Sequence, residues 1–169
     1  MKVLQILLNH KNERGKIVGY DFREIITSVD FIDLYRNRYR NLVIIPLINS
    51  LVAIPLTDDL FDEINTNQEM AITNYEYLTD QIGKFCSEIS QSSRTTYVEA
   101  EYFGGVGSQS GIVWELGEVI FEETLSNSAI NKSLEILGVM RLKEKDEFDT
   151  VRLGRHRFID DWLNKETHL

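Results

Sequence analysis

The stretch from Tyr97 to Trp114, YVEAEYFGGVGSQSGIVW, limits what this chain can fold into more than any other segment. Two runs in which side chains alternate with a period of two flank a glycine-rich centre. This pattern predicts a β-hairpin, because glycine supplies the positive φ angles and the close backbone approach that a tight connection requires. The glycines concerned are Gly104, Gly105 and Gly107. We therefore expect the hairpin 97–116 to be central to a sheet.

The glycine-rich centre does not match a phosphate-binding loop. After Gly105 and Gly107, the third glycine of a dinucleotide fingerprint comes one place late, at Gly111. No Lys-Ser or Lys-Thr pair ends the loop, and a strand follows it, whereas phosphate-binding loops open a helix. The sequence therefore predicts a structural turn here, and it predicts no cofactor.

One face of the hairpin combines carboxylates with aromatic rings. Its first arm carries Tyr97, Glu99, Glu101 and Phe103, and Glu115 on the second arm can lie opposite. Charge flanked by aromatic rings is a common composition of interfaces, although a solvated sheet face or a face covered by a helix gives the same pattern. Paired carboxylates also serve as acid and base in glycoside hydrolysis, or bind divalent cations. A small enzyme that uses this carboxylate cluster, with or without a metal ion, is therefore an alternative to a binding surface.

Hydrophobic periodicity and turn residues predict the remaining elements. The further strands are expected at 3–8, 41–48, 51–56 and 118–121. Helices are expected at 22–36, from Asp58 onward, at 70–90, from Ser126 or Ser128 to Gly138, at 146–153 and at 158–163. Asp21 is the expected N-cap of the first helix and Thr57 that of the second. Cys86 falls on the inner stripe of the helix 70–90, which predicts a core residue.

These elements indicate an α+β fold. With 169 residues, the chain is of the size of one domain. We expect residues 1–169 to form a single domain with a mostly antiparallel sheet and helices packed on at least one face. Pro46 and Pro55 each remove an amide donor, so their strands should lie at an edge or carry a bulge.

Charge is distributed unevenly along the chain, whose net charge is −9. Residues 41–83 and 95–131 contain no Lys or Arg. The acids of these two windows are Asp58, Asp59, Asp62, Glu63, Glu69, Glu76 and Asp80, followed by Glu99, Glu101, Glu115, Glu118, Glu122 and Glu123. If the windows meet in space, they create a field that attracts a basic partner. The alternative is that these acids only keep the surface solvated.

Several classes of protein are disfavoured by composition. The acidic balance argues against a nucleic-acid-binding surface. No apolar run reaches the ~18 residues that a membrane span needs, and the N-terminus lacks the cleavage site of a signal peptide. Cys86 is the only cysteine, so an intrachain disulfide and a cysteine metal cluster are not expected. We therefore expect a cytoplasmic protein without a membrane or nucleic-acid partner.

Four segments resemble a group of small bacterial cytoplasmic proteins without a known activity. They read IPLTDDLFDEIN, YVEAEYFGGVGSQSGIVW, AINKSLEILGV and DEFDTVRLGRHRFIDDW. These proteins in turn resemble immunity proteins, which accompany secreted toxins. The resemblance covers about the last two-thirds of the chain and carries no catalytic residues to transfer. It implies a bacterial toxin–immunity context and no mechanism.

Taken together, the sequence predicts a non-catalytic binding protein, an immunity-type inhibitor that neutralises a basic toxin domain through an acidic surface. The expected contact residues are Asp58, Asp59, Asp62, Glu63, Glu99, Glu101 and Glu115, with Tyr97 and Phe103 as apolar anchors. No catalytic or metal-binding residues are assigned. A homodimer or larger assembly built on the strand pair 41–56 is a further hypothesis, and the oligomeric state stays open.

Overall fold

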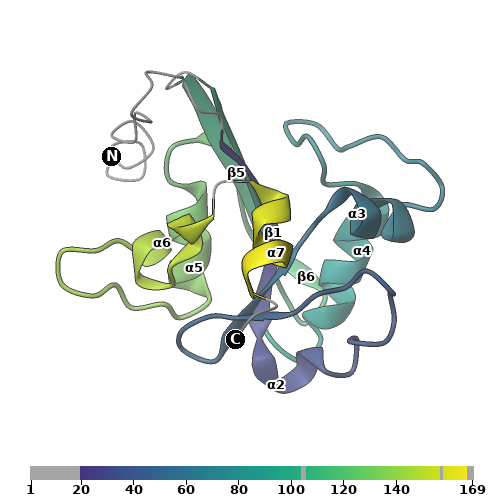
Figure 1. The fold of residues 1–169 in the computed structure, drawn as a ribbon, viewed down its shortest axis with the longest axis horizontal. Helices are drawn as coiled ribbons and strands as arrows, with labels where there is room; N and C mark the ends of the chain where they lie inside the picture. Colours follow the sequence, from purple (N-terminus) through teal and green to yellow (C-terminus); the bar gives the residue numbers. More distant parts are fainter. Residues whose placement is uncertain (1–19, 104–105, 157, 167–169) are drawn as a thin grey trace.

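A computed structural model describes residues 20–103, 106–156 and 158–166 of the chain. Within them, one six-stranded sheet has the order β2-β3-β1-β4-β5-β6, and every neighbouring pair is antiparallel (Figure 1). The strands are β1 Tyr20–Ser28, β2 Ile45–Pro46, β3 Leu51–Pro55, β4 Thr95–Phe103, β5 Val106–Glu115 and β6 Glu118–Ser126. The α+β fold with an antiparallel sheet is confirmed, whereas the strand predicted at 3–8 lies outside the described residues.

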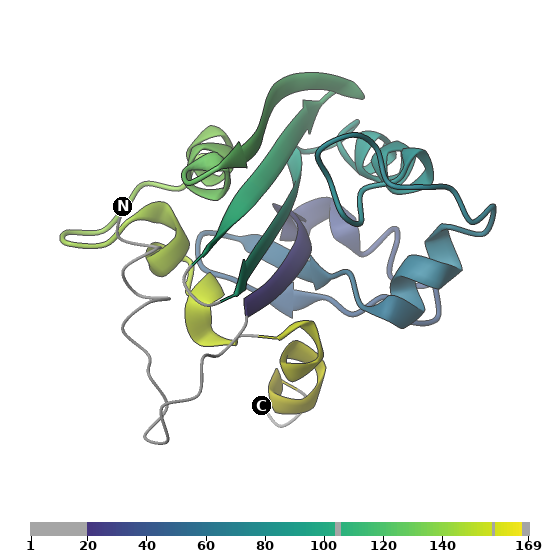
Figure 2. The same ribbon diagram turned by 90° about the horizontal axis from the view of Figure 1, so that it is seen from above.

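Helices cover both faces of this sheet. They are α2 Val29–Ile32, α3 Asp58–Ile64, α4 Asp80–Ile89, α5 Ala129–Ile136, α6 Glu147–Thr150, the 3₁₀ helix η1 Leu153–Arg155 and α7 Ile159–Glu166. In Figures 1 and 2, α3 and α4 lie on one side of the sheet, and α5 and α6 lie on the other. The core divides accordingly: Ile25, Phe85 and Tyr97 belong to the α3–α4 side, whereas Phe22, Leu134 and Trp162 belong to the other.

The predicted hairpin forms and lies next to the centre of the sheet. Tyr97 pairs with Ile112, and Phe103 with Val106. The two turn glycines 104 and 105 lie outside the described residues. Gly111 has a packing role, because a Cβ there would lie 2.5 Å from Ser133 Oγ of α5. A helix can approach the sheet this closely only where the strand carries no side chain.

The predicted helix 22–36 is wrong. Tyr20–Ser28 forms β1, which lies between β3 and β4, and only α2 is helical in this stretch. Because helices cover both faces of the sheet, both faces of a central strand are buried, and its apolar residues lose the simple alternation of an exposed strand. The β-branched run Ile25–Thr27 fits a pleated surface better than a helix. Asp21 is therefore a strand residue and not an N-cap.

The predicted helix 70–90 exists only in its second half. Thr79 is the N-cap of α4, its side chain accepting a hydrogen bond from the Ile82 amide, and Asn74 has a positive φ of 68°. Ile82 and Cys86 face the core as expected, with Cys86 fully buried. Residues 70–79 instead form a loop over the sheet. The helical spacing of their apolar residues therefore predicts the wrong structure for this segment.

Several local predictions are confirmed. Thr57 caps α3 by accepting a hydrogen bond from the Leu60 amide. Asn49 and Ser50 form the tight turn, with φ angles of 63° and 58°, and Pro46 lies on the edge strand β2. The prediction of an edge strand or a bulge is wrong for Pro55, because β3 is an inner strand with regular register. Pro55 is tolerated as the last residue of β3, beyond Val52 and Ala53, which pair with β2.

Candidate functional site

The polar end of the sheet face below the 70–79 loop forms a cavity of about 330 Å³. Four carboxylates line it: Asp21 from β1, Glu99 and Glu101 from β4, and Glu76 from the loop. Its other walls come from Phe22, Asn74, Tyr75, Tyr77, Ala100, Ser108, Ser110 and Leu125, so no Lys or Arg of the described residues lines it. Strand register explains the grouping, because Asp21 pairs with Glu101, which in turn pairs with Ser108. The site is therefore concave and acidic.

Glu99 holds the loop against the sheet. Its carboxylate accepts hydrogen bonds from the backbone amides of Glu76 at 2.7 Å and Tyr77 at 3.2 Å, and from the Tyr97 hydroxyl at 2.6 Å. Burial raises the pKa of Glu99, while these donors act in the opposite direction. Ser110 adds a fourth contact by donating to the Asn74 carbonyl. Glu99 therefore has a structural role in the cavity, because its carboxylate already accepts three hydrogen bonds.

The remaining carboxylates of the cavity are electrostatically coupled. Burial raises the pKa of Glu76, and a hydrogen bond with Glu101 raises it further. Burial also raises the pKa of Asp21; attraction from Arg23 opposes this shift, and repulsion from Glu101 and Asp58 adds to it. A cation placed between these carboxylates lowers their free energy, because it relieves their mutual repulsion. The arrangement favours a guanidinium or ammonium group as the occupant.

One buried arginine lies beside the cavity. Arg23 is 2% exposed; its Nε donates to the Leu56 carbonyl and its Nη2 pairs with Asp58. The guanidinium lies 3.7 Å from the centre of the Tyr77 ring. Arg23 therefore fixes the start of α3 and the wall of the cavity, and its positive charge partly offsets the negative charges of Asp21 and Glu99.

The structure brings acids of the two acidic windows together at the cavity. Glu76 from the first acidic window lies beside Glu99 and Glu101 from the second. Asp58, which is exposed, is close enough to influence the pKa of Asp21. Phe103 is 70% exposed at the end of β4. The influence of Asp58 on Asp21 links the beginning of α3 to the cavity.

Two expected contact residues have a different role. Tyr97 is fully buried, so it cannot serve as an apolar anchor for a partner and instead positions Glu99 through its hydroxyl. The predicted grouping of Glu115 with Glu99 and Glu101 is wrong, because Glu115 lies at the other end of β5 and forms an ion pair with Arg94. Strand register separates them: Glu101 pairs with Ser108, seven residues before Glu115 in the chain. Among the described residues, no group of three or more His, Cys, Asp or Glu side chains is arranged to hold a metal ion.

The acids of α3 divide into free and engaged side chains. Asp59 and Asp62 are exposed on the helix. Glu63 accepts hydrogen bonds from the backbone amides of Arg40 at 2.6 Å and Asn41 at 2.9 Å, which lower its pKa. Glu63 therefore anchors the segment before β2, and it is less available to a partner than its neighbours.

Sequence reasoning missed Asp21 and Glu76 as site residues. The capping pattern predicts a helix N-cap at Asp21, although its spacing from Arg23 is also that of two residues on one face of a strand. The apolar spacing predicts a helix at Glu76, whereas its position over the sheet follows from the hydrogen bond between its amide and Glu99, far apart in sequence. Only the tertiary structure shows such contacts.

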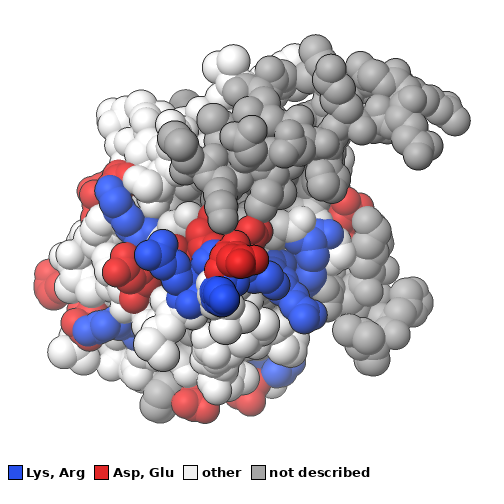
Figure 3. Space-filling view, turned by 90° about the vertical axis from the view of Figure 1, so that its left-hand side faces the viewer, with Lys and Arg blue, Asp and Glu red and all other residues white. Residues whose placement is uncertain are grey.

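The opposite side of the molecule has a different charge character. On the face that includes α5 and α6, lysine and arginine side chains lie among acidic ones (Figure 3). Exposed bases in this part of the chain include Lys132, Arg141, Lys143, Lys145 and Arg152. The acidic cavity lies on the α3–α4 side, whereas Glu115 and Glu123 of the second acidic window form ion pairs with Arg94 and Lys132.

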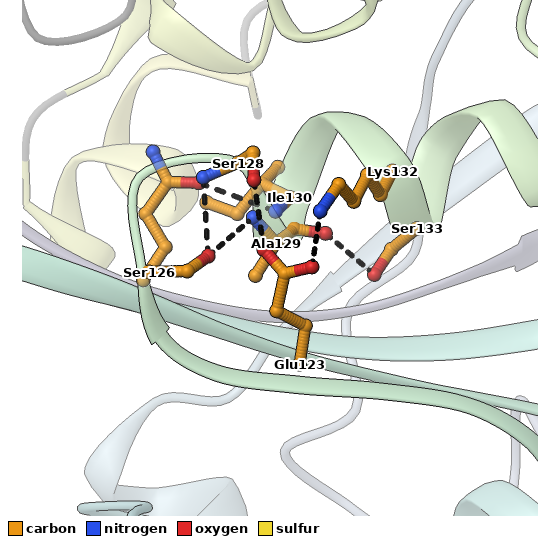
Figure 4. Close-up of polar contacts among 8 residues, drawn as sticks. Glu123, Ser126, Ser128, Ala129, Ile130, Lys132 and Ser133 are labelled. Carbon is orange, nitrogen blue, oxygen red and sulfur yellow. Dashed lines mark hydrogen bonds and ion pairs between the residues drawn. The ribbon is translucent and has the colours of Figure 1, made fainter.

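The N-terminus of α5 is closed by side chains, as expected for a helix beginning at Ser126 or Ser128. Ser126 Oγ accepts hydrogen bonds from the amides of Ser128 and Ala129, and Gln109 accepts one from Ile130 (Figure 4). Ser128 occupies the N-cap position but makes no capping hydrogen bond there. With these amides satisfied, the helix end offers no anion-binding site.

Comparison with protein families, with curated proteins and with solved structures gives no match for this chain. Within the described residues, none of the helices has both the length and the apolar character required to cross a membrane.

Proposed function

We propose that this chain is a non-catalytic binding protein of the immunity type, which neutralises a basic bacterial toxin in the cytoplasm. The observation that carries the proposal is the cavity of about 330 Å³ lined by Asp21, Glu76, Glu99 and Glu101. A concave site with several carboxylates and no cation in its lining suits an arginine or lysine side chain of a protein partner. Such an inserted side chain is the kind of contact that dominates interface energy.

The surroundings of the cavity extend this site into a surface. Exposed Asp59 and Asp62 on α3 add negative charge, whereas Asp58 is paired with Arg23. Phe103 adds an exposed ring at the end of β4. Long-range attraction by such a surface speeds encounter with a basic partner and makes the rate fall as salt rises. A nucleic acid would be repelled by the same charges.

The carboxylate cluster on which the enzyme alternative depends, Glu99, Glu101 and Glu115, does not form. Glu115 is remote from the cavity, and all donors around Glu99 are engaged in holding the loop. Glu76 and Glu101 are the remaining carboxylate pair of the cavity, and a hydrogen bond between them raises the pKa of Glu76. We therefore retain the binding function as the proposal.

The test is co-purification with the product of the adjacent gene at low salt. We expect a complex whose association rate falls on the order of tenfold when Glu101 or Glu76 is replaced by lysine, because each reversal removes steering charge and blocks the cavity. Glu135→Lys, on the exposed face of α5, is the matched control and should change the rate little. Absence of a complex at low salt, or equal effects of Glu101→Lys and Glu135→Lys, would refute the proposal.

A further inference from the structure

The strand β6 is the long open edge of the sheet. It is last in the strand order, and its nine residues pair with β5 on one side only. Among the described residues, no backbone hydrogen bond reaches residues 118–126 from any other segment. The opposite edge is different, because β2 has two residues and contains Pro46. Among the described strands, β6 is therefore the edge with the longer row of backbone donors and acceptors that no strand covers.

The side chains of β6 combine negative charge with exposed apolar surface. The strand, EVIFEETLS, contains no Pro, Lys or Arg, so its charge discourages pairing with another acidic strand but does not oppose a basic one. Three of its apolar residues are well exposed: Val119 at 51%, Ile120 at 45% and Leu125 at 63%. Bulges interrupt its pairing with β5 near both ends, and the register is regular from Phe121 to Glu123. An added strand would cover the exposed apolar side chains and complete the backbone pairing.

The charge of β6 selects the occupant. Glu123 turns toward α5, where it pairs with Lys132 and accepts a hydrogen bond from Ser128 (Figure 4). Glu118 and Glu122 are exposed and have no cationic partner in an ion pair among the described residues. Pairing with a second copy would bring these acids close to their own counterparts, which destabilises a sheet. A strand with lysine or arginine at alternate positions relieves the same charge.

The edge is continuous with the acidic cavity. Leu125 lines the cavity, and Ser110, another lining residue, accepts a hydrogen bond from the Leu125 amide. Glu122 accepts a hydrogen bond from the hydroxyl of Tyr75, whose side chain also forms part of the cavity wall. A segment paired along β6 would therefore run past the cavity mouth, and one of its basic side chains could enter it.

We propose that β6 is a docking edge for an extended basic segment of a protein partner, which pairs with residues 118–126 and extends the sheet by one strand. The basic character of the partner rests on the proposed function, whereas the open edge does not. Backbone pairing supplies affinity and the acids of β6 supply selectivity, as in other cases of strand addition.

The experiment uses synthetic nine-residue peptides and the full chain labelled for nuclear magnetic resonance. The probe peptide alternates lysine and valine, and the first control replaces each lysine by glutamate. Two further controls keep the lysine–valine sequence and carry N-methyl groups on alternate amides, one on the odd-numbered amides and the other on the even-numbered amides. We expect the lysine peptide to shift amide signals of residues 118–126 and to slow their hydrogen exchange. N-methylation should weaken binding at least tenfold in one phase and leave it nearly unchanged in the other, because only alternate amides of an added strand face the sheet.

Variants distinguish the edge from the acidic surface as a whole. Val119→Lys adds a positive charge to the edge, and Leu34→Lys adds the same charge at a residue that is 79% exposed outside the sheet. We expect Val119→Lys to weaken peptide binding about tenfold and Leu34→Lys to have little effect. No binding, equal loss with both N-methyl phases, or self-association through β6 would overturn the proposal. Because no toxin is used, failure here leaves the test of the proposed function unaffected.

Discussion

Replacing Glu24 with leucine should stabilise this protein at neutral pH. Glu24 lies in the middle of β1, between Pro55 of β3 and Val98 of β4, and it is completely buried. Neither of its carboxyl oxygens has a hydrogen-bond partner among the described residues. Burial raises the pKa of Glu24 well above its ordinary value, although the positive charge of Arg155 acts in the opposite direction.

The magnitude follows from the cost of an unsatisfied buried polar group. We expect Glu24→Leu to raise the free energy of unfolding by about 2 kcal/mol at pH 7.5. For a chain of this length the change corresponds to an increase in Tm of about 4–8 °C. Leucine has a similar volume and fills the same space beside Phe22 and Ile26 of the core.

The pH dependence has a definite sign. A carboxyl whose folded pKa lies above its unfolded pKa favours the folded state at low pH, and this contribution is lost as pH rises through the folded pKa. The gain from Glu24→Leu should therefore be smallest near pH 4 and grow toward pH 7.5. Glu24→Gln keeps a polar group but cannot ionise. It should therefore show only the pH-dependent part of the increase in the free energy of unfolding.

Urea denaturation at pH 4, 6 and 7.5 measures these differences. Glu135→Gln on the exposed face of α5 is the control, and it should leave the wild-type profile unchanged. A loss of stability in Glu24→Leu at pH 7.5 would refute the reasoning, since it would mean that the native carboxylate is ionised and well paired. A gain that is independent of pH would refute the assignment of the titration to Glu24.

Three further substitutions test other parts of the structure. Glu99→Ala removes the acceptor for two loop amides and for the Tyr97 hydroxyl; it should cost about 3 kcal/mol and speed hydrogen exchange in residues 74–77, whereas unchanged exchange there would contradict its structural role. Gly111→Ala places a Cβ 2.5 Å from Ser133 Oγ and should cost about 1–3 kcal/mol, and Ser133→Ala in the same chain should recover part of that loss. Thr57→Ala removes the N-cap of α3 and should cost about 1 kcal/mol, with Thr57→Ser as the conservative control in thermal denaturation.

Sequence alone predicted the features that depend on neighbouring residues. The hairpin of β4 and β5, the turn at Asn49-Ser50, the cap at Thr57 and the α+β class all follow from local alternation, turn chemistry and capping. The same applies to the carboxylates Glu99 and Glu101, which share a strand face because of the two-residue period of a strand.

The tertiary structure decided which surfaces are covered and which carboxylates meet. Residues 20–28 are a central strand because helices pack on both sides, and this removes the alternation that distinguishes a strand from a helix in sequence. Asp21 and Glu76 join the cavity, and Glu115 does not, because strand register and the path of the 70–79 loop bring distant residues together. Those contacts depend on the free energy of packing the whole chain, which no local pattern contains.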